Sequence, residues 1–172
     1  MPARRTIAVV LAFIALAGCG RTAAAPQMGP GEGVVTKHVD GDTLHVTIAN
    51  RDETVRFIGI DTPETHGRGG LRECFGKEAS ARTAKLLPLG TRVRLVRDVE
   101  ARDRYRRLLA YVYRAADDLF VNLELARQGY AAVLTYPPNV AHTAEFVAAA
   151  AEARAQNRGL WQRCGDADVP IT

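Results

Sequence analysis

The chain has 172 residues, of which 47% are hydrophobic, and a formal net charge of +4 from 23 Lys and Arg against 19 Asp and Glu. This length and hydrophobic content indicate one folded domain with an appendage and exclude a disordered chain. The slight basicity is compatible with a polyanionic partner but does not by itself indicate one. Beyond the N-terminus, no stretch of sequence is long and apolar enough to span a membrane.

Residues 1–18 have the layout of a signal peptide. Arg4 and Arg5 give a positive start, and the apolar run 6–17 is too short for a comfortable membrane span. The Leu-Ala-Gly-Cys sequence that ends at Cys19 resembles the lipobox of bacterial lipoproteins, where cleavage precedes a cysteine that receives a diacylglycerol. We therefore expect an exported protein that a lipid on Cys19 anchors to the cell membrane. The alternatives are an ordinary signal peptide cut nearby and a buried helix.

Residues 19–32 are small, contain Pro and Gly, and show no periodic pattern, which predicts a flexible tether. The folded domain is expected at 33–164, with a C-terminal tail at 165–172. Cys74 and Cys164 remain in the mature chain, and in an oxidising compartment one pair allows one disulfide. The alternative is two separate buried thiols. Neither cysteine has a Cys or His at the spacing of a zinc site.

The first part of the predicted domain is a three-stranded antiparallel meander. Apolar and polar residues alternate along 44–48, and the segments 34–39 and 55–60 are also strand-like, with turn sequences at 40–42 and 50–52. Further along the chain we expect helices at 73–87, 120–128 and 142–157, and strands at 93–96 and 108–113. About five short strands and three helices predict an α+β fold that is mainly β, a small closed barrel with helices packed against it.

Four acidic residues stand at two of these turn regions: Asp40, Asp42, Asp61 and Glu64. If the strands on either side of Asn50 pair through that turn, their outer ends meet, and Asp42 then faces Asp61 and Glu64. Clustered carboxylates repel one another and need protons or a cation. Oxygen ligands alone suit Ca²⁺ or Mg²⁺. The alternative is that these side chains are simply solvated turn residues.

Two basic features add to this pattern. Arg56 lies in an otherwise apolar run and must find an anion, which is either one of the nearby acids or a phosphate held by its fork of donors. The stretch 102–107 contains four arginines and Tyr105 directly before a strand. Basic residues beside an aromatic ring are typical of nucleic-acid contacts, although a solvated charged turn is the simpler interpretation.

A series of short motifs connects these features: Asp40-Gly41-Asp42-Thr43, Val55-Arg56, Ile60-Asp61-Thr62-Pro63-Glu64-Thr65, Gly76-Lys77-Glu78-Ala79-Ser80, Asp103-Arg104-Tyr105 with Arg107 before Leu-Leu-Ala-Tyr, Val121-Asn122 with Gln128-Gly129, and Gly159-Leu160-Trp161. Together these motifs resemble the staphylococcal nuclease (thermonuclease) family over roughly residues 33–161. The resemblance implies a five-stranded OB-fold barrel with three packed helices. It also implies a calcium-dependent, sugar-nonspecific nuclease that hydrolyses the bond from phosphorus to the 5′ oxygen of DNA and RNA and leaves 3′-phosphate ends.

The resemblance also implies roles for individual residues. One Ca²⁺ ion would be bound by the carboxylates of Asp42 and Asp61 and the backbone carbonyl of Thr62. Glu64 would act on the attacking water, and Arg56 and Arg107 would stabilise the transition state. Substrate contacts would come from Arg104, Tyr105 and Tyr136. We expect a monomer with a preference for single-stranded substrates.

The chain departs from the family pattern at two places. The family usually has Gly where this chain has Arg106, so the turn before Arg107 could differ, since Gly often permits positive φ. One of two family tyrosines matches Tyr136, while the other position falls at Leu134 or Thr135. The rival hypotheses are a nucleic-acid-binding module without catalysis and a structural lipoprotein with a stabilising calcium site. The group that protonates the leaving oxygen, Arg107 or water, stays open.

Overall fold

The structure is a computed structural model that describes residues 31–65, 72–166 and 169–171. The predicted signal peptide, the lipidation site Cys19 and nearly all of the predicted tether lie outside the described residues. Gly31 and Glu32, the last two residues assigned to the tether, are part of the fold, because β1 begins at Glu32 and the Gly31 carbonyl accepts a hydrogen bond from Leu95.

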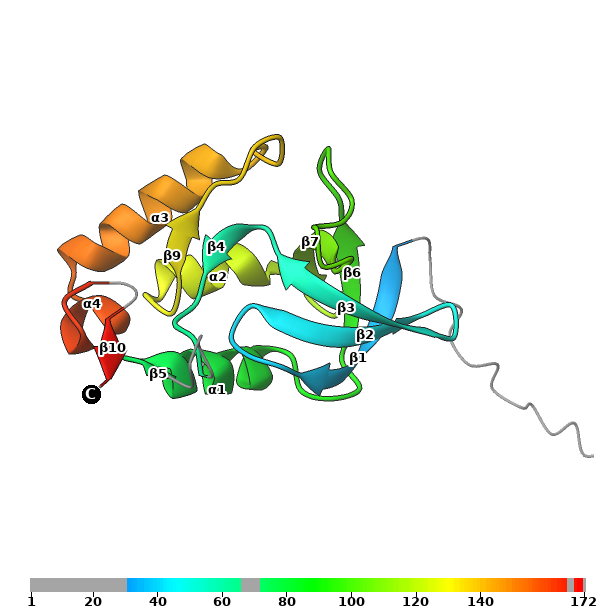
Figure 1. Ribbon diagram of the computed structural model, residues 1–172, viewed down its shortest axis with the longest axis horizontal. Coiled ribbons are helices and arrows are strands. Elements are labelled where there is room, and N and C mark those ends of the chain that lie inside the picture. Colours follow the sequence, from blue (N-terminus) through cyan, green and yellow to red (C-terminus); the bar gives the residue numbers. More distant parts are fainter. Residues whose placement is uncertain (1–30, 66–71, 167–168, 172) are drawn as a thin grey trace, which may run out of the picture.

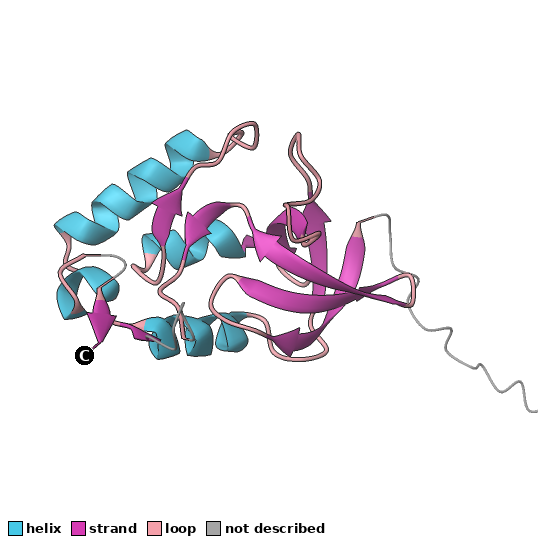
Figure 2. Ribbon diagram, viewed as in Figure 1, coloured by secondary structure: helices cyan, strands magenta, loops and turns pink. Residues whose placement is uncertain are grey.

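Five strands close into a barrel: β1 (Glu32–His38), β2 (Thr43–Ile48), β3 (Arg51–Phe57), β6 (Arg92–Val96) and β7 (Leu108–Arg114). The sheet order β3-β2-β1-β6-β7 returns to its start because β3 also pairs in parallel with β7. Alternate residues of the strands point inward, as in Leu44, Val46, Val55 and Phe57, and form the core. The predicted mainly β OB-fold barrel is confirmed (Figures 1 and 2).

Helices cover the barrel and extend it on one side. α1 (Gly76–Leu86), α2 (Val121–Arg127) and α3 (Thr143–Ala155) correspond to the three predicted helices, and α4 (Leu160–Arg163) is a short fourth helix that the sequence did not predict. In Figure 1, α1 lies along the bottom of the molecule and α3 across the top left. Burial of Phe146 and three alanines on one face of α3 attaches this helix to the body.

The predicted strand 55–60 is in fact two strands. β3 ends at Phe57, and β4 (Gly59–Asp61) turns away from the barrel to pair with β9 (Ala132–Leu134). Gly59 permits this break because its φ is 83° and a Cβ there would lie 2.2 Å from the ring of Phe146. The redirected strand places Asp61 opposite Ala132 of β9.

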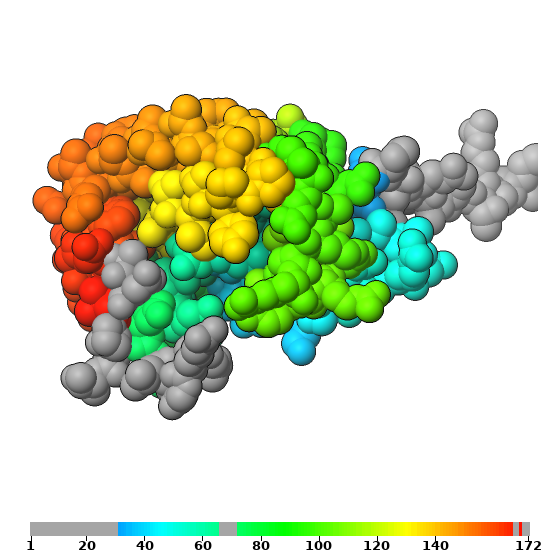
Figure 3. Space-filling view, turned by 45° about the horizontal axis from the view of Figure 1, so that its top comes forward, coloured from blue at the N-terminus to red at the C-terminus, as the bar shows by residue number. Residues whose placement is uncertain are grey.

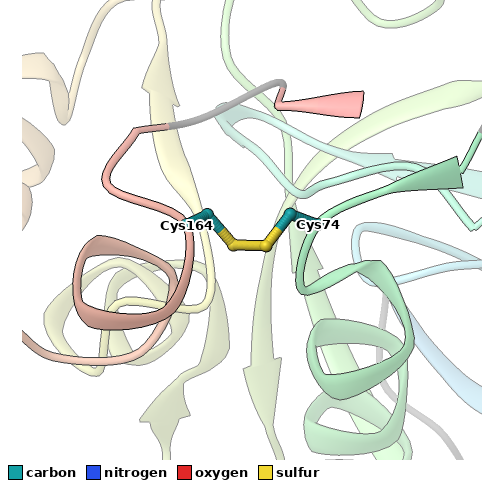
Figure 4. The surroundings of a disulfide bond; sticks show 2 residues. All are labelled: Cys74 and Cys164. Carbon is teal, nitrogen blue, oxygen red and sulfur yellow. A yellow bond between two sulfur atoms is a disulfide. The ribbon is translucent and has the colours of Figure 1, made fainter. Parts of the chain in front are cut away.

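Further short strands join segments that are distant in sequence. β8 (Leu119–Phe120) pairs antiparallel with β7. β5 (Arg72–Glu73) pairs with β10 (Pro170–Ile171), so part of the predicted C-terminal tail belongs to a small sheet. α1 accordingly begins at Gly76, three residues later than predicted. Beside β5, the Cys74 and Cys164 sulfurs form a disulfide with an S–S distance of 1.99 Å (Figure 4). No helix in the described part of the chain is long and apolar enough to cross a membrane.

Candidate active site

The turn between β1 and β2 places Asp42 against the segment that follows β4. Pairing of Thr43 with Arg56 aligns β2 and β3, and the Phe57 amide donates to the Asp42 carbonyl at 2.9 Å. The Asp42 carboxylate is buried and accepts hydrogen bonds from the amide and hydroxyl of Thr62 at 2.8 and 3.0 Å. The predicted approach of the two strand ends is therefore present.

Arg56 connects the two predicted metal-binding carboxylates. Its guanidinium lies 3.1 Å from an Asp42 oxygen and 2.5 Å from an Asp61 oxygen, and the side chain is 13% exposed. The same group donates to the carbonyls of Phe57 and Ile60 at 2.9 and 3.0 Å. Backbone acceptors thus fix the plane of the guanidinium independently of its ionic partners.

The Asp42 carboxyl has an unusual environment for an acid. Burial raises its pKa from 3.8 to about 7, and the neighbouring Asp40 and Asp61 add to the increase, while Arg56 and the Thr62 amide oppose it. Desolvation and like charges both disfavour the ionised form. A single arginine therefore does not compensate the negative charge that is concentrated at this corner.

Glu64 follows on the same segment, with an exposed side chain. Its amide is held by a hydrogen bond to the Glu73 carboxylate at 2.8 Å. Partial burial raises the pKa of Glu64, and repulsion from Asp40, Asp61 and Glu73 acts in the same direction. Within the described residues, the Glu64 carboxylate accepts no hydrogen bond, so it is available to a water molecule.

The donor set at this corner fits a hard divalent cation. Asp42 and Asp61 offer carboxylate oxygens, and Thr62 offers a neutral carbonyl next to them. A cation there would relieve the repulsion that contributes to the raised pKa values of Asp42 and Glu64. Among the described residues, no three His, Cys, Asp or Glu side chains are placed to hold a metal by themselves. An ion at this corner therefore needs the carbonyl and water as further ligands.

The second arginine, Arg107, precedes β7 in a turn organised by Asp103. The Asp103 carboxylate accepts from the amides of Tyr105 and Arg107 at 2.9 Å each and from Arg107 Nε at 2.7 Å. Arg106 has a φ of 67°, so the turn adopts the left-handed conformation that glycine favours, with an arginine in its place. Asp103 thus fixes Arg107 through Nε, and among the described residues the two terminal nitrogens of Arg107 make no hydrogen bond.

A cavity of about 470 Å³ brings the two arginines together. Parallel pairing of β3 with β7 aligns Arg56 with Leu109, two residues after Arg107, and all three line the cavity. Its other walls include Arg104, Tyr105, Leu134, Tyr136 and Asn139. The described lining does not include Asp42, Asp61, Thr62 or Glu64, so the carboxylates lie beside the cavity, and Arg56 belongs to both.

Two exposed tyrosines flank the cavity. Tyr105 is 61% exposed and Tyr136 is 74% exposed, and the guanidinium of Arg104 lies 4.7 Å from the Tyr105 ring centre. The peptide bond between Pro137 and Pro138, directly after Tyr136, is cis. In Figure 3, the yellow surface around β9 and the start of its following loop meets the green surface of the β6–β7 connection. Planar rings at a basic cavity suit stacking against bases or sugars.

Sequence reasoning missed the residues that hold the cavity walls together. The amide side chain of Asn139 is buried and makes two hydrogen bonds to the backbone of Glu100, at 2.7 and 3.1 Å. The Asp98 carboxylate accepts from the Ala141 amide at 3.0 Å and from the Tyr111 hydroxyl at 2.8 Å. An Asn after two prolines indicates an irregular loop, and the local sequence does not identify the partner of its side chain.

Comparison with known proteins identifies the family of this chain. The family described as Staphylococcal nuclease homologue matches residues 54–163, a range that contains every predicted catalytic and substrate-binding residue. A thermonuclease of Staphylococcus intermedius is 39% identical over 90% of this chain and 91% of its own length. A thermonuclease of Staphylococcus hyicus is 35% identical over 74% and 73% of the two chains. Endonuclease YncB of Bacillus subtilis is 35% identical over 74% of this chain and 60% of its own. The chain belongs to the staphylococcal nuclease family.

Proposed function

We propose that this chain is a calcium-dependent nuclease that hydrolyses DNA and RNA at the bond from phosphorus to the 5′ oxygen and leaves 3′-phosphate ends. The observation that carries the proposal is the position of Arg56, which contacts two carboxylates suited to a cation and also lines the cavity with Arg107. The names of the similar thermonucleases and endonucleases support the same reaction class.

Glu64 acts on the attacking water in this proposal. The water oxygen forms a bond to phosphorus, its proton passes to the Glu64 carboxylate, and the electron pair of the breaking bond leaves with the 5′ oxygen. That oxygen then receives a proton from Arg107 or from water. A raised pKa suits Glu64 to this role, because a stronger base accepts a proton more readily near neutral pH.

Arg56 and Arg107 stabilise the charge that develops on the phosphate oxygens. Both guanidiniums are anchored by fixed acceptors: Arg56 by two carbonyls, and Arg107 by Asp103. Preorganised donors of this kind need little rearrangement as the negative charge grows, and loss of one such donor typically lowers kcat by about 10² to 10³.

Asp42, Asp61 and the Thr62 carbonyl would hold one Ca²⁺ ion. When bound, the ion supplies positive charge at the scissile phosphate and makes nearby water more acidic. The Thr62 amide and hydroxyl already fix one Asp42 oxygen, so this side chain is oriented before any ion arrives.

Arg104, Tyr105 and Tyr136 contact the nucleotide on the cavity side. Arg104 would bind a terminal phosphate, and the exposed rings would lie against sugar or base. The family's second tyrosine matches Leu134 or Thr135, and Leu134 lines the cavity wall. Neither side chain is aromatic, so we expect weaker base stacking at that position. Stacking on exposed rings favours unpaired bases, which supports single-stranded substrates.

We further propose that the protein is an exported monomer, held to the cell membrane by lipid at Cys19, at the extracellular face or in the periplasm. The disulfide between Cys74 and Cys164 supports export, because such bonds persist in oxidising compartments.

One assay tests the enzymatic proposal. The mature domain is incubated with single-stranded DNA in Ca²⁺ or in a chelator, and cleavage is expected only with Ca²⁺. Glu64→Gln and Arg107→Gly should each lower kcat by about 10² or more with the fold intact, whereas Glu152→Gln on α3 should cleave at the wild-type rate. Binding of DNA without cleavage would identify a binding module, and neither binding nor cleavage would identify a structural protein.

A further inference from the structure

Glu64 and Glu73 lie side by side, although they are nine positions apart in the sequence. The Glu64 amide donates to the Glu73 carboxylate at 2.8 Å, and the Glu73 amide donates to the Glu64 carbonyl at 2.9 Å. Residues 62–64 belong to no helix or strand, so the regular hydrogen bonds of a ladder do not fix the Glu64 backbone. The two hydrogen bonds with Glu73 hold the Glu64 backbone instead.

The start of α1 approaches Glu64 equally closely. A Cβ at Gly76 would lie 2.7 Å from the Glu64 carbonyl oxygen and 2.9 Å from that of Pro63. Such a distance is too short for any side chain, so the first residue of the helix packs directly on the peptide that carries Glu64. A displacement of the segment 73–76 would therefore move Glu64.

The segment 73–76 is in turn fixed to the C-terminal part of the chain. Cys74 is bonded to Cys164, directly after α4, and the Cys74 amide donates to the Val169 carbonyl at 2.7 Å. Glu73 pairs with Pro170 in the antiparallel ladder of β5 and β10. Figure 4 shows the sulfur bridge between the chain before α1 and the chain after α4.

We propose that Glu73 is a positioning residue for Glu64 and that the Cys74–Cys164 disulfide holds Glu73 in place, so that the rate of cleavage depends on the bond. The inference rests on the proposed catalytic role of Glu64. Glu73 is absent from the described lining of the cavity and acts through Glu64, whose backbone it holds. A carboxylate displaced by about 1 Å from its water costs on the order of 10² in rate, so a small loss of order here has a large effect.

The test compares Glu73→Ala, which removes the acceptor for the Glu64 amide, with Glu73→Gln, which keeps an oxygen acceptor. Glu73→Ala should lower kcat by about tenfold to hundredfold, with KM and Ca²⁺ affinity changed less than about threefold. Glu73→Gln should retain most of the wild-type kcat. Glu78→Ala, an exposed acid on α1, is the matched control and should leave kcat unchanged. Circular dichroism verifies that each variant is folded.

A second arm separates positioning from general stabilisation. In a Glu64→Gln background, Glu73→Ala should not lower the residual rate further, because its effect passes through Glu64. Loss of the Cys74–Cys164 disulfide, by reduction or in the double variant Cys74→Ala with Cys164→Ala, should also lower kcat. This loss of kcat should nearly vanish when Glu73→Ala is already present.

The outcomes are distinct. If the wild-type protein does not cleave, the proposed function fails. If it cleaves and Glu73→Ala has the wild-type kcat, or lowers the residual rate of Glu64→Gln by the same factor, Glu73 is only structural and the inference is wrong. If reduction leaves kcat unchanged, the disulfide does not hold Glu73.

Discussion

Arg106 places a side chain where the backbone favours glycine. Its φ of 67° lies in the left-handed region, its amide donates to the Asp103 carbonyl at 2.9 Å, and its carbonyl accepts from Arg102 at 2.8 Å. Arg102 also makes two hydrogen bonds to Glu53 on β3. The turn that presents Arg107 is thus kept in the glycine-like conformation by its neighbours, against a local cost of about 1 to 2 kcal/mol.

Replacement of Arg106 by Gly should raise the free energy of unfolding by up to about 1 kcal/mol. Relief of the left-handed strain exceeds the extra freedom that Gly gives the unfolded chain, which is worth about 0.4 to 1 kcal/mol. Urea denaturation measures the change. Arg106→Ala removes the same charge but keeps a Cβ and should show no such gain. An equal gain in both variants would attribute the effect to charge and contradict the argument from φ.

Asp42 makes the stability of the metal-free domain depend on pH. Its pKa is about 7 in the fold against 3.8 as an ordinary carboxyl, so as the pH rises the unfolded chain loses this proton first. The contribution of Asp42 to stability is therefore complete below about pH 4 and decreases up to about pH 7, where the folded chain also ionises. One factor of ten in an ionisation constant corresponds to about 1.4 kcal/mol, so the total loss is at most about 4 kcal/mol.

Asp42→Asn should remove this dependence, because an amide stays neutral and its oxygen still accepts from Thr62. In the presence of a chelator, the Tm of the wild type should be higher at pH 5 than at pH 8. The Tm of Asp42→Asn should differ less between these two pH values. The variant should also have the higher Tm at pH 8. If the Tm of the wild type, compared with that of the variant, were higher at pH 8 than at pH 5, the raised pKa of Asp42 would be contradicted. At pH 8, added Ca²⁺ should raise the Tm of the wild type but not that of Asp42→Asn.

Part of the site was predictable from the sequence because it depends on one hairpin. The turn at Asn50 pairs β2 with β3 and so brings Asp42 beside Phe57, four residues before Asp61. The convergence of Arg56 and Arg107 has a different origin, since it requires the parallel pairing of β3 with β7. Periodicity reports which face of a strand is buried and does not report which distant strand lies beside it.

At the level of elements, α2 packs on the barrel through apolar side chains and one buried amide. Asn122 donates from Nδ2 to the carbonyls of Ile58 and Ala110 at 2.9 and 3.3 Å, and its Oδ1 accepts from the Val112 amide at 2.9 Å. These partners lie at the end of β3 and in the middle of β7. The side chain therefore satisfies backbone groups where the chain leaves the barrel towards β4.

Asn122→Ala should lower the free energy of unfolding by about 2 to 4 kcal/mol, because it leaves a buried amide and carbonyl without partners. Thermal or urea unfolding measures the loss. Gln156→Ala at the exposed end of α3 removes a comparable amide and should cost less than about 0.5 kcal/mol. If the two variants lost similar amounts of free energy of unfolding, the buried hydrogen bonds of Asn122 would not be specifically stabilising.

The predicted elements were most accurate where a periodic pattern is long. The barrel strands and the three longer helices lie within a few residues of their predicted places. The break at Gly59 was missed, because Ile58 and Ile60 continue an apolar run whose direction changes only through packing against Phe146. β9, β10 and α4 are two to four residues long, too short for any periodicity, and form through tertiary contacts.

At the level of the whole molecule, the Cys74–Cys164 disulfide spans 90 positions of the sequence. It links the chain before α1 with the chain after α4, and thus joins the two ends of everything from α1 to α4. In the chain-entropy treatment, a cross-link over a loop of this size stabilises the fold by about 4 to 5 kcal/mol.

Reduction, or Cys74→Ala with Cys164→Ala, should therefore lower the free energy of unfolding by up to about 4 to 5 kcal/mol. Urea denaturation with and without reductant measures the difference. In the double variant, which lacks both thiols, reductant should have no effect. A midpoint that is the same in oxidised and reduced wild-type protein would show that the bond adds no stability.

The same bond decides what a protease can release. The exposed loop after Tyr136 lies between the two cysteines, so a single cut there leaves both new ends within one covalent ring, and no fragment departs. A cut at the turn of Ala49 and Asn50 lies outside the ring, and the piece with β1, β2 and Asp42 is then retained only by packing and hydrogen bonds. A nick at the tyrosine wall of the cavity therefore leaves one covalent molecule, whereas a nick at the hairpin that carries Asp42 leaves two.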